Sequence, residues 1–148
     1  MKIYIDADSC SVKSETFKVA LRYKIVVYVV ANSYIKVPLS QYIRLEVVSD
    51  KFDAADDWII EKIEENDILI TSDILLAEKA VQKKARVLGQ KGNELDEENI
   101  GSALAAREIS GHLRNLGAQG TGPSAFLKSD RSRFLGKLDQ IIQSLKKS

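Results

Sequence analysis

Short apolar runs alternate with helical segments through the first 88 residues, and this alternation constrains the fold more than any other feature of the chain. Residues 25–30 form the clearest run, a continuous and mostly β-branched sequence typical of a parallel strand covered on both faces. Similar patterns predict further strands over residues 2–5, 45–48, 67–70 and 85–88. Between the strands, helices are predicted over residues 12–23, 53–64 and 74–84.

Strands joined by helices connect through right-handed crossovers, so we expect a three-layer α/β fold around a mostly parallel sheet of about five strands. Beyond these strands the pattern changes to a helix over 100–116, a glycine-rich loop over 116–125 and a last helix over 129–145. We therefore predict a single domain across all 148 residues, with a sheet core over 1–88 and an extension of two extra helices over 89–148.

The composition limits the kinds of partner and compartment that we expect for this chain. The net charge is +1, so any attraction to nucleic acid must come from how charge is distributed over the surface. No apolar run approaches the ~20 residues that span a bilayer, and we expect no membrane partner. The single cysteine, Cys10, cannot form an internal disulfide, which favours a reducing cytoplasm.

Carboxylates follow two of the predicted strands. Asp6 and Asp8 come directly after the first strand, and Asp73 follows the strand over 67–70 in the same way. Ligands of parallel sheets bind outside the carboxyl ends of the strands. If the first and fourth strands are neighbours, Asp6 and Asp73 face each other at that edge. Neither acid has an obvious structural use there, which favours a functional role.

The first turn of the helix over 53–64 brings Asp53, Asp56 and Asp57 toward the same edge. Carboxylates ~5 Å apart repel by about 3 kcal/mol at an effective dielectric constant of 20, so such a cluster requires a cation. Oxygen ligands favour Mg²⁺ or Mn²⁺. One histidine and one cysteine argue against a zinc site of the usual kind. The predicted metal ligands are Asp6, Asp8, Asp56, Asp57 and Asp73, with one of Asp56 and Asp57 pointing inward.

Structural alternatives stay open for several of these acids. Asp53 could be the N-cap of its helix, and Asp8 could cap a helix beginning near Ser9. Asp56 and Asp57 could complement the helix dipole.

Three cations are candidates for contact with phosphate. Lys13 lies at the start of the first helix, and Arg131 and Arg133 lie near the start of the last one. Alternatively, Lys13 is solvated, Ser129 is the N-cap of the last helix, and the arginines form ion pairs with the acidic cluster. Trp58 is predicted to lie in the core.

The motifs together resemble the small bacterial YaiI/YqxD-type family, which is related to PIN-like nuclease folds. The residues that carry the resemblance include Asp6-Ala7-Asp8, Cys10, Lys13, Asn32, Phe52 to Ile59, Thr71, Asp73, Glu98-Asn99-Ile100 and Asp130-Arg131-Arg133-Phe134. The chain departs from the family pattern at Ser11, Gly89-Gln90 and Thr121, all in predicted loops. The resemblance implies a PIN-like fold with a metal site ringed by carboxylates, and it implies no particular substrate.

We therefore expect a metal-dependent nuclease that hydrolyses phosphodiesters, of RNA rather than DNA, with Asp6, Asp8 and Asp73 as catalytic residues. One alternative is a phosphotransferase of the haloacid-dehalogenase type with Asp6 as nucleophile, although Ser9-Cys10 replaces that superfamily's usual x-Thr. A second alternative is a non-catalytic module that binds nucleic acid or protein. A homo-oligomer stays open.

Overall fold

A computed structural model describes residues 1–51, 53–115 and 126–147. The strands are β1 Ile3–Asp6, β2 Val27–Ala31, β3 Ile43–Val47, β4 Ile68–Ile70, β5 Arg86–Leu88 and β6 Glu94–Leu95. The helices are α1 Lys13–Tyr23, α2 Ala54–Lys62, α3 Ile74–Gln82, α4 Ile100–Asn115 and α5 Lys128–Lys146, with a short 3₁₀ turn at Ala7–Ser9. The glycine-rich loop predicted over 116–125 lies outside the described residues.

The strands form one sheet in the order β3-β2-β1-β4-β5-β6. All neighbours are parallel except β5 and β6, which are antiparallel. The predicted α/β class and mostly parallel sheet are confirmed. Strand β1 pairs with β4, which meets the condition under which Asp6 and Asp73 were expected to face each other. The short strand β6 was not expected, because two residues are too few to show a periodic pattern.

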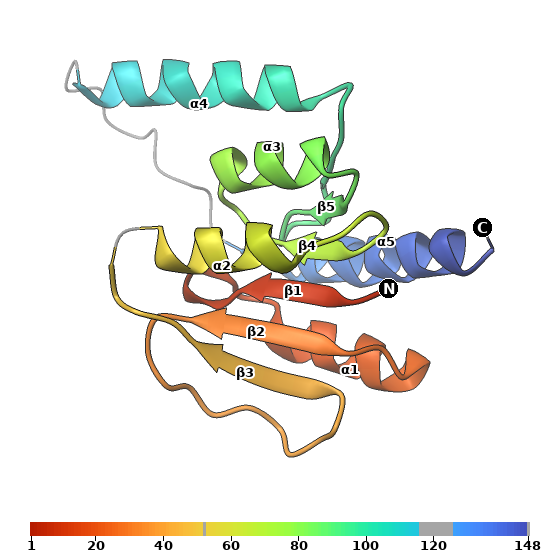
Figure 1. The fold of residues 1–148 in the computed structure, drawn as a ribbon. Helices are drawn as coiled ribbons and strands as arrows, with labels where there is room; N and C mark the ends of the chain where they lie inside the picture. The colour runs from red at the N-terminus through yellow and green to blue at the C-terminus, as the bar shows by residue number, and fades with distance from the viewer. Residues whose placement is uncertain (52, 116–125, 148) are drawn as a thin grey trace.

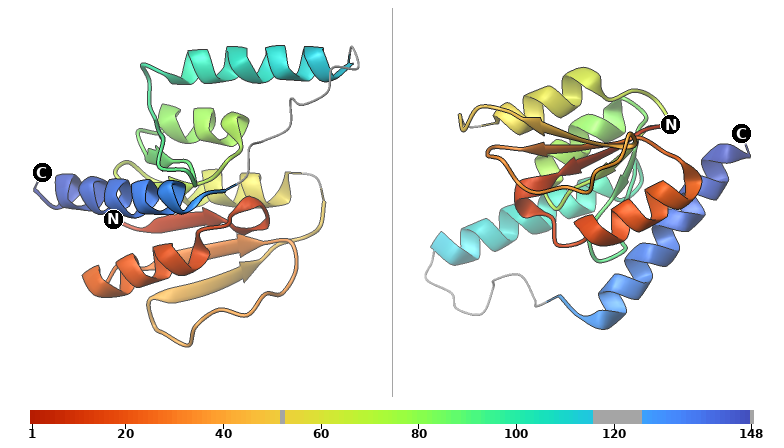
Figure 2. Two further views of the ribbon diagram at one scale, coloured as in Figure 1. Left: turned by 180° about the vertical axis from the view of Figure 1, so that it is seen from behind. Right: turned by 90° about the horizontal axis from the view of Figure 1, so that it is seen from below.

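Helices cover both faces of the sheet (Figures 1 and 2). Helices α1 and α5 lie on one face, α2 and α3 lie on the other, and α4 lies outside α3. Successive residues of β1 point to opposite faces. Ile3 and Ile5 therefore join the core under α1 and α5, whereas Tyr4 joins the core under α2 and α3. This two-sided burial explains why the strands are apolar without alternation.

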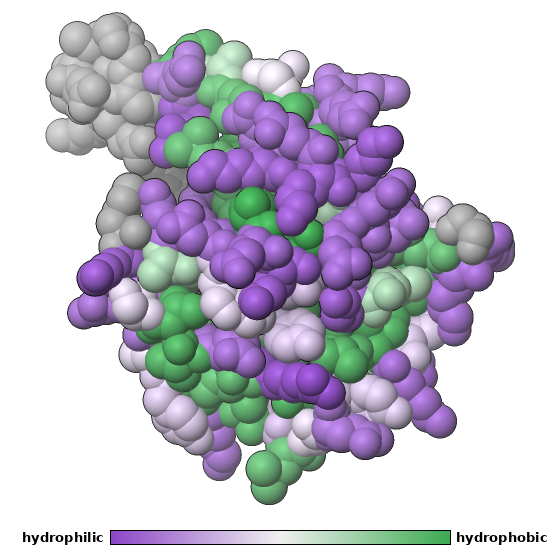
Figure 3. Space-filling model, in the orientation of Figure 1, coloured by the Kyte–Doolittle hydropathy of each residue, from purple (hydrophilic) through white to green (hydrophobic). Residues whose placement is uncertain are grey.

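Hydrophilic side chains gather over α2 and α3, whereas hydrophobic ones lie lower on the same face, toward β2 and β3 (Figure 3). In the described part of the chain, no helix has the length and apolar character needed to cross a membrane.

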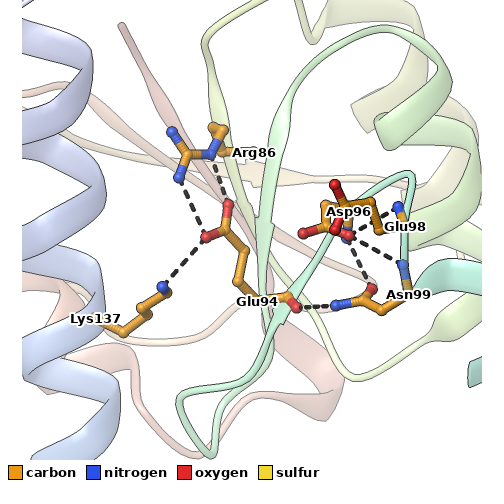
Figure 4. Close-up of polar contacts among 6 residues, drawn as sticks. All are labelled: Arg86, Glu94, Asp96, Glu98, Asn99 and Lys137. Carbon is orange, nitrogen blue, oxygen red and sulfur yellow. Dashed lines mark hydrogen bonds and ion pairs between the residues drawn. The ribbon is translucent and has the colours of Figure 1, made fainter.

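The residues after β5 contribute to the sheet and to its core. Phe134, Leu138 and Ile141 of α5 are buried against the α1 side of the sheet. Glu94 of β6 accepts a hydrogen bond from Arg86 Nε at 2.6 Å and forms an ion pair with Lys137 of α5 at 3.5 Å (Figure 4). The hydrogen bond to Glu94 raises the pKa of Arg86. This contact joins the end of the sheet to the last helix.

The loop between β6 and α4 is closed by its own polar groups, as Figure 4 shows. Asp96 Oδ1 accepts hydrogen bonds from the backbone N–H groups of Glu98 and Asn99 at 2.9 and 3.0 Å. Asn99 Nδ2 donates to the Glu94 carbonyl at 2.9 Å. The sequence Glu98-Asn99-Ile100 therefore has a structural use at the start of α4.

The predicted helix and strand boundaries hold to within about two residues, but the predicted cap of the last helix is not confirmed. Helix α5 begins at Lys128 with Leu127 at the N-cap position, so the expectation of Ser129 as N-cap is wrong. Asp130 Oδ2 accepts a hydrogen bond from the Leu127 N–H at 2.9 Å, and this bond closes the first turn.

Candidate functional site: an acidic pocket at the sheet edge

A cavity of about 380 Å³ lies at the carboxyl ends of the strands, where ligands of parallel sheets bind. Its lining comes from the ends of β1, β2 and β4 and from the loop and first turn that lead into α2. We call it the acidic pocket; its lining residues are Asp6, Asp8, Asn32, Asp50, Lys51, Asp53, Ala54, Ala55, Asp56, Ser72 and Asp73. Six of these are aspartates, and Lys51 is the one lysine or arginine among the described lining residues.

Asp6 is the most buried acid of the pocket, with 8% of its surface exposed. The hydroxyl of Thr71 donates to Asp6 Oδ2 at 3.0 Å and accepts a hydrogen bond from the Asp73 N–H at the same distance. Because β1 and β4 are neighbours, Thr71 can join the two strand ends directly. Thr71 carries part of the family resemblance, but sequence reasoning gave it no role at the site.

Asp73 has a clear structural role, which corrects the expectation that it has little structural use. It is the N-cap of α3, and its Oδ1 accepts hydrogen bonds from the N–H groups of Leu75 and Leu76 at 2.9 and 3.4 Å. These bonds satisfy donors that the first turn of a helix leaves unpaired. Asp73 also lines the pocket, so its carboxylate serves the helix end and the site together.

Asp8 is exposed and connects two loops of the pocket. Its Oδ2 accepts a hydrogen bond from the backbone N–H of Asn32, just after β2, at 3.2 Å. The alternative role of Asp8 as a helix cap is wrong, because α1 begins only at Lys13, with Val12 at its N-cap position.

The acids before and within α2 divide into those that line the pocket and one that does not. Asp53 occupies the N-cap position with a left-handed backbone, at a φ of 63°, and the structure records no hydrogen bond from its side chain to the described helix start. The predicted N-cap position of Asp53 is therefore confirmed, but among the described residues its carboxylate accepts no capping hydrogen bond. Asp56 is half-buried and lines the pocket, whereas Asp57 is exposed and outside the described lining. Asp50 lines the pocket although no pattern in the sequence singled it out.

The pKa of Asp56 reflects this accumulation of acids. Its pKa is raised from 3.8 to about 6, first by burial and then by the charges of Asp73, Asp6 and Asp53 in that order, while Lys79 opposes them. A carboxyl group among like charges is destabilised in its ionised form, and a nearby cation would relieve that cost.

The acids surround the cavity without converging on one point. Within residues 1–51, 53–115 and 126–147, no three or more histidine, cysteine, aspartate or glutamate side chains are grouped closely enough to hold a metal ion directly. An ion held by direct contact with several of these carboxylates would require their side chains to rotate inward.

Lys13 follows Asp6 and Asp8 closely in the sequence, but its ammonium group binds the loop after β1. Its Nζ donates to the carbonyl oxygens of Ala7 and Cys10 at 3.1 and 2.7 Å. Cys10 is buried, and burial raises the pKa of its thiol, as fits a structural cysteine. Lys13 is not among the described residues that line the pocket.

The arginines of α5 have partners elsewhere. Arg131 forms an ion pair with Glu15 of α1 at 3.2 Å, and Arg133 forms one with Asp130 of its own helix. Their predicted pairing with the acidic cluster is wrong, because α5 packs against α1 on the opposite face of the sheet from α2. Neither arginine is among the described residues that line the pocket.

The fold and the pocket define an α/β protein with an aspartate-rich cavity at the carboxyl edge of a parallel sheet. The chain belongs to the YaiI/YqxD family, since the family model described as "Uncharacterized BCR, YaiI/YqxD family" matches residues 4–144. The family prediction is thereby confirmed.

The relatives match this chain over nearly its whole length. A UPF0178 protein of Rhodospirillum centenum is 46% identical over 151 residues, covering 99% of this chain and 98% of the relative. A second, from Rhodospirillum rubrum, is 45% identical and covers 99% of each chain. A third, from Caulobacter vibrioides, is 42% identical and covers 99% of this chain and 95% of its own. No solved structure matches, and the relation to PIN-like nucleases stays a prediction.

Proposed function

We propose that the acidic pocket binds a divalent cation, Mg²⁺ or Mn²⁺, and hydrolyses phosphodiester bonds of nucleic acid, RNA in preference to DNA. One observation carries the proposal: six aspartates from separate segments line one cavity at the carboxyl edge of the sheet, against a single lysine among the described lining. An acid-lined cavity repels an anionic phosphate unless a cation is bound first.

The donor set fits a hydrated ion. Mg²⁺ keeps several of its waters and uses only one or two protein carboxylates, so it does not need a closed cage of direct ligands. Asp6 and Asp56 are the proposed ligands, because Asp6 is held by Thr71 and the pKa of Asp56 is raised by burial and by its acidic neighbours. A divalent ion supplies an activated water and offsets the charge of the phosphate.

The remaining groups have separate proposed roles. Asp73 and Asp8 line the pocket while fixed to α3 and to the loop after β2, so they orient water or a second hydrated ion. Lys51 is exposed on the pocket rim, and we assign it the phosphate contact that the sequence suggested for Lys13, Arg131 and Arg133.

The decisive experiment compares two neighbouring acids of α2. We expect Asp56→Asn to weaken Mn²⁺ binding by about tenfold or more, the size of effect seen when a group that supports a metal site is removed. Asp57→Asn is the matched control, because it removes the same charge from the same helix outside the described lining. Mn²⁺ affinity is measured by calorimetry, and cleavage of a labelled single-stranded RNA is followed with the same variants.

The proposal fails if Asp56→Asn and Asp57→Asn bind Mn²⁺ equally well, because the effect would then be one of overall charge. Binding should also strengthen as pH rises through about 6, where the Asp56 carboxyl loses its proton. The phosphotransferase and binding-module alternatives stay predictions, and a phospho-aspartate trapped on Asp6 would favour the former.

A further inference from the structure

A second cavity, of about 310 Å³, lies on the same side of the sheet at the other end of β1 and α2. We call it the aromatic hollow; it is lined by Lys2, Tyr4, Tyr28, Trp58, Lys62 and Glu64. Tyr4 and Asp6 point to the same face of β1 because they are two residues apart. The aromatic hollow and the acidic pocket therefore lie on one surface, at opposite ends of the same strand and helix.

Three aromatic rings form the wall of the aromatic hollow. The rings of Tyr4 and Tyr28 are stacked, with centroids 5.3 Å apart, and the Trp58 ring is tilted against them at 6.2 and 5.8 Å. Tyr4 is buried, whereas Tyr28 and Trp58 are only half-buried, so the expectation that Trp58 lies in the core is only partly met. Partly exposed ring surface beside an open cavity can accept a further flat ring.

Cations surround these rings. Lys62 Nζ lies 6.0 Å from the centroid of the Trp58 ring, and Arg44 Cζ lies 5.9 Å from that of the Tyr28 ring. Lys2 and Lys62 each have an acidic neighbour only at 3.9 Å, in Glu64 and Glu61 respectively. Exposed pairs of this kind are weak, so the cations can turn toward another anion. Among the described residues that line the aromatic hollow, Lys2 and Lys62 outnumber the single acid Glu64, the reverse of the balance in the acidic pocket.

We propose that the aromatic hollow binds one base of a single-stranded nucleic acid. The base stacks on the exposed surface of Trp58 and Tyr28, and the flanking phosphates contact Lys2, Lys62 and Arg44. Stacking on protein rings requires an unpaired base with an open face, which a duplex does not offer. The volume is at the small end of the ~300–1,000 Å³ range of ligand sites, which suits one base.

This proposal rests on the proposed nuclease function in treating the strand as substrate. Helix α2 has nine residues and is therefore about 14 Å long. A strand with one base in the aromatic hollow could run along α2 and place a phosphate a few nucleotides away at the acidic pocket. The proposed substrate class is then single-stranded nucleic acid, with one base bound in the aromatic hollow at a distance from the bond that is cleaved.

Trp58 is the single tryptophan of the chain, so its fluorescence reports on the aromatic hollow directly. The full-length protein is titrated with hexa-adenylate RNA in EDTA, which removes divalent ions and prevents cleavage. We expect saturable quenching of Trp58 emission. A long blunt-ended duplex, which stays paired in EDTA, and inorganic tripolyphosphate are the comparison ligands, and neither should quench, because neither presents an unpaired base.

Variants separate this site from general charge and from the acidic pocket. Lys62→Gln should weaken hexa-adenylate binding and reduce the slope of log affinity against log salt by about 0.7, the value for one phosphate contact on a single strand. Lys18→Gln, an exposed change on α1, is the matched control and should alter neither. Tyr28→Leu should weaken binding by at least about fivefold through lost stacking, provided its thermal unfolding stays cooperative.

The proposal is overturned if hexa-adenylate does not quench Trp58, if tripolyphosphate quenches equally, or if Lys18→Gln and Lys62→Gln behave alike. Asp56→Asn distinguishes it from the proposed function. Quenching that persists in Asp56→Asn supports base binding at the aromatic hollow even if Mn²⁺ binding and cleavage prove absent. Loss of quenching in Asp56→Asn would show that base binding is not independent of the acidic pocket and would overturn this proposal. The metal proposal would still be decided by Mn²⁺ binding.

Discussion

The acidic pocket and the aromatic hollow share β1 and α2 but differ in almost every chemical respect. The pocket gathers six aspartates from the end of β1, the first turn of α2 and the loops between elements, whereas the hollow is built from rings on β1, β2 and α2 with cations around them. The difference follows from the direction of the parallel strands. At their carboxyl ends the strands lead into polar loops and helix starts, where ligands bind. The hollow instead uses rings that project from within β1, β2 and α2, of which Tyr28 and Trp58 are half-buried.

The comparison also shows two ways of holding a site together. In the pocket, Thr71 links the ends of β1 and β4 through hydrogen bonds to Asp6 and Asp73. In the hollow, ring contacts between Tyr4, Tyr28 and Trp58 provide the frame, with Tyr4 also donating to the Lys62 carbonyl at 3.3 Å. Changes to one frame should therefore leave the other site intact.

The largest expected effect comes from Thr71→Val. Thr71 is 2% exposed, and losing its hydroxyl leaves the Asp73 N–H and one oxygen of Asp6 without this partner. We expect the free energy of unfolding to fall by about 2 kcal/mol, as measured by urea denaturation. Thr71→Ser keeps the hydroxyl and should lose less than half as much. If the folded Thr71→Val variant shifts the Trp58 emission maximum, the contacts that hold the pocket are not independent of those that hold the hollow, and the comparison is refuted.

A smaller, stabilising effect is expected from Asp56→Asn. Because the pKa of Asp56 is raised from 3.8 to about 6 by folding, its contribution to stability falls as pH rises between these values and stays unfavourable above them. Asn removes this penalty, and after allowance for solvent screening we expect a gain of about 1 kcal/mol at pH 7.5. Thermal unfolding at pH 3.5 and pH 7.5 measures the difference, which should vanish at the lower pH.

Asp57→Asn is again the control for Asp56→Asn, since its carboxylate is exposed and outside the described lining. An equal gain in both variants would show that the overall negative charge of α2 is responsible. The pocket would then not be a distinct cluster of interacting acids.

The smallest effect is expected from Arg44→Gln in the aromatic hollow. The guanidinium lies over the Tyr28 ring at an exposed position, where such a contact contributes about 0.5 kcal/mol. Stability should therefore change by no more than this in urea denaturation, while the affinity for hexa-adenylate falls measurably. Mn²⁺ binding should stay unchanged, and a parallel loss of Mn²⁺ affinity would refute the independence of the two sites.

The sequence alone identified the family, the α/β class and the concentration of acids at the carboxyl edge, whereas the structure supplied the adjacency of β1 and β4. These predicted features depend on apolar patterns among residues close together in the sequence and on the general right-handedness of strand connections. Three expected acids that follow predicted strands, Asp6, Asp8 and Asp73, line the pocket for that reason.

Only the tertiary structure decided which side chains complete the pocket. Asp56 and Asp57 are adjacent in sequence, yet the ~100° turn per helical residue points one into the cavity and leaves the other in solvent. Lys13 and Arg131 have long side chains whose partners are whichever carbonyl or carboxylate the packing of α1 and α5 brings within reach. Asp50 joins the site because its loop returns to the sheet edge, an event that no local pattern encodes.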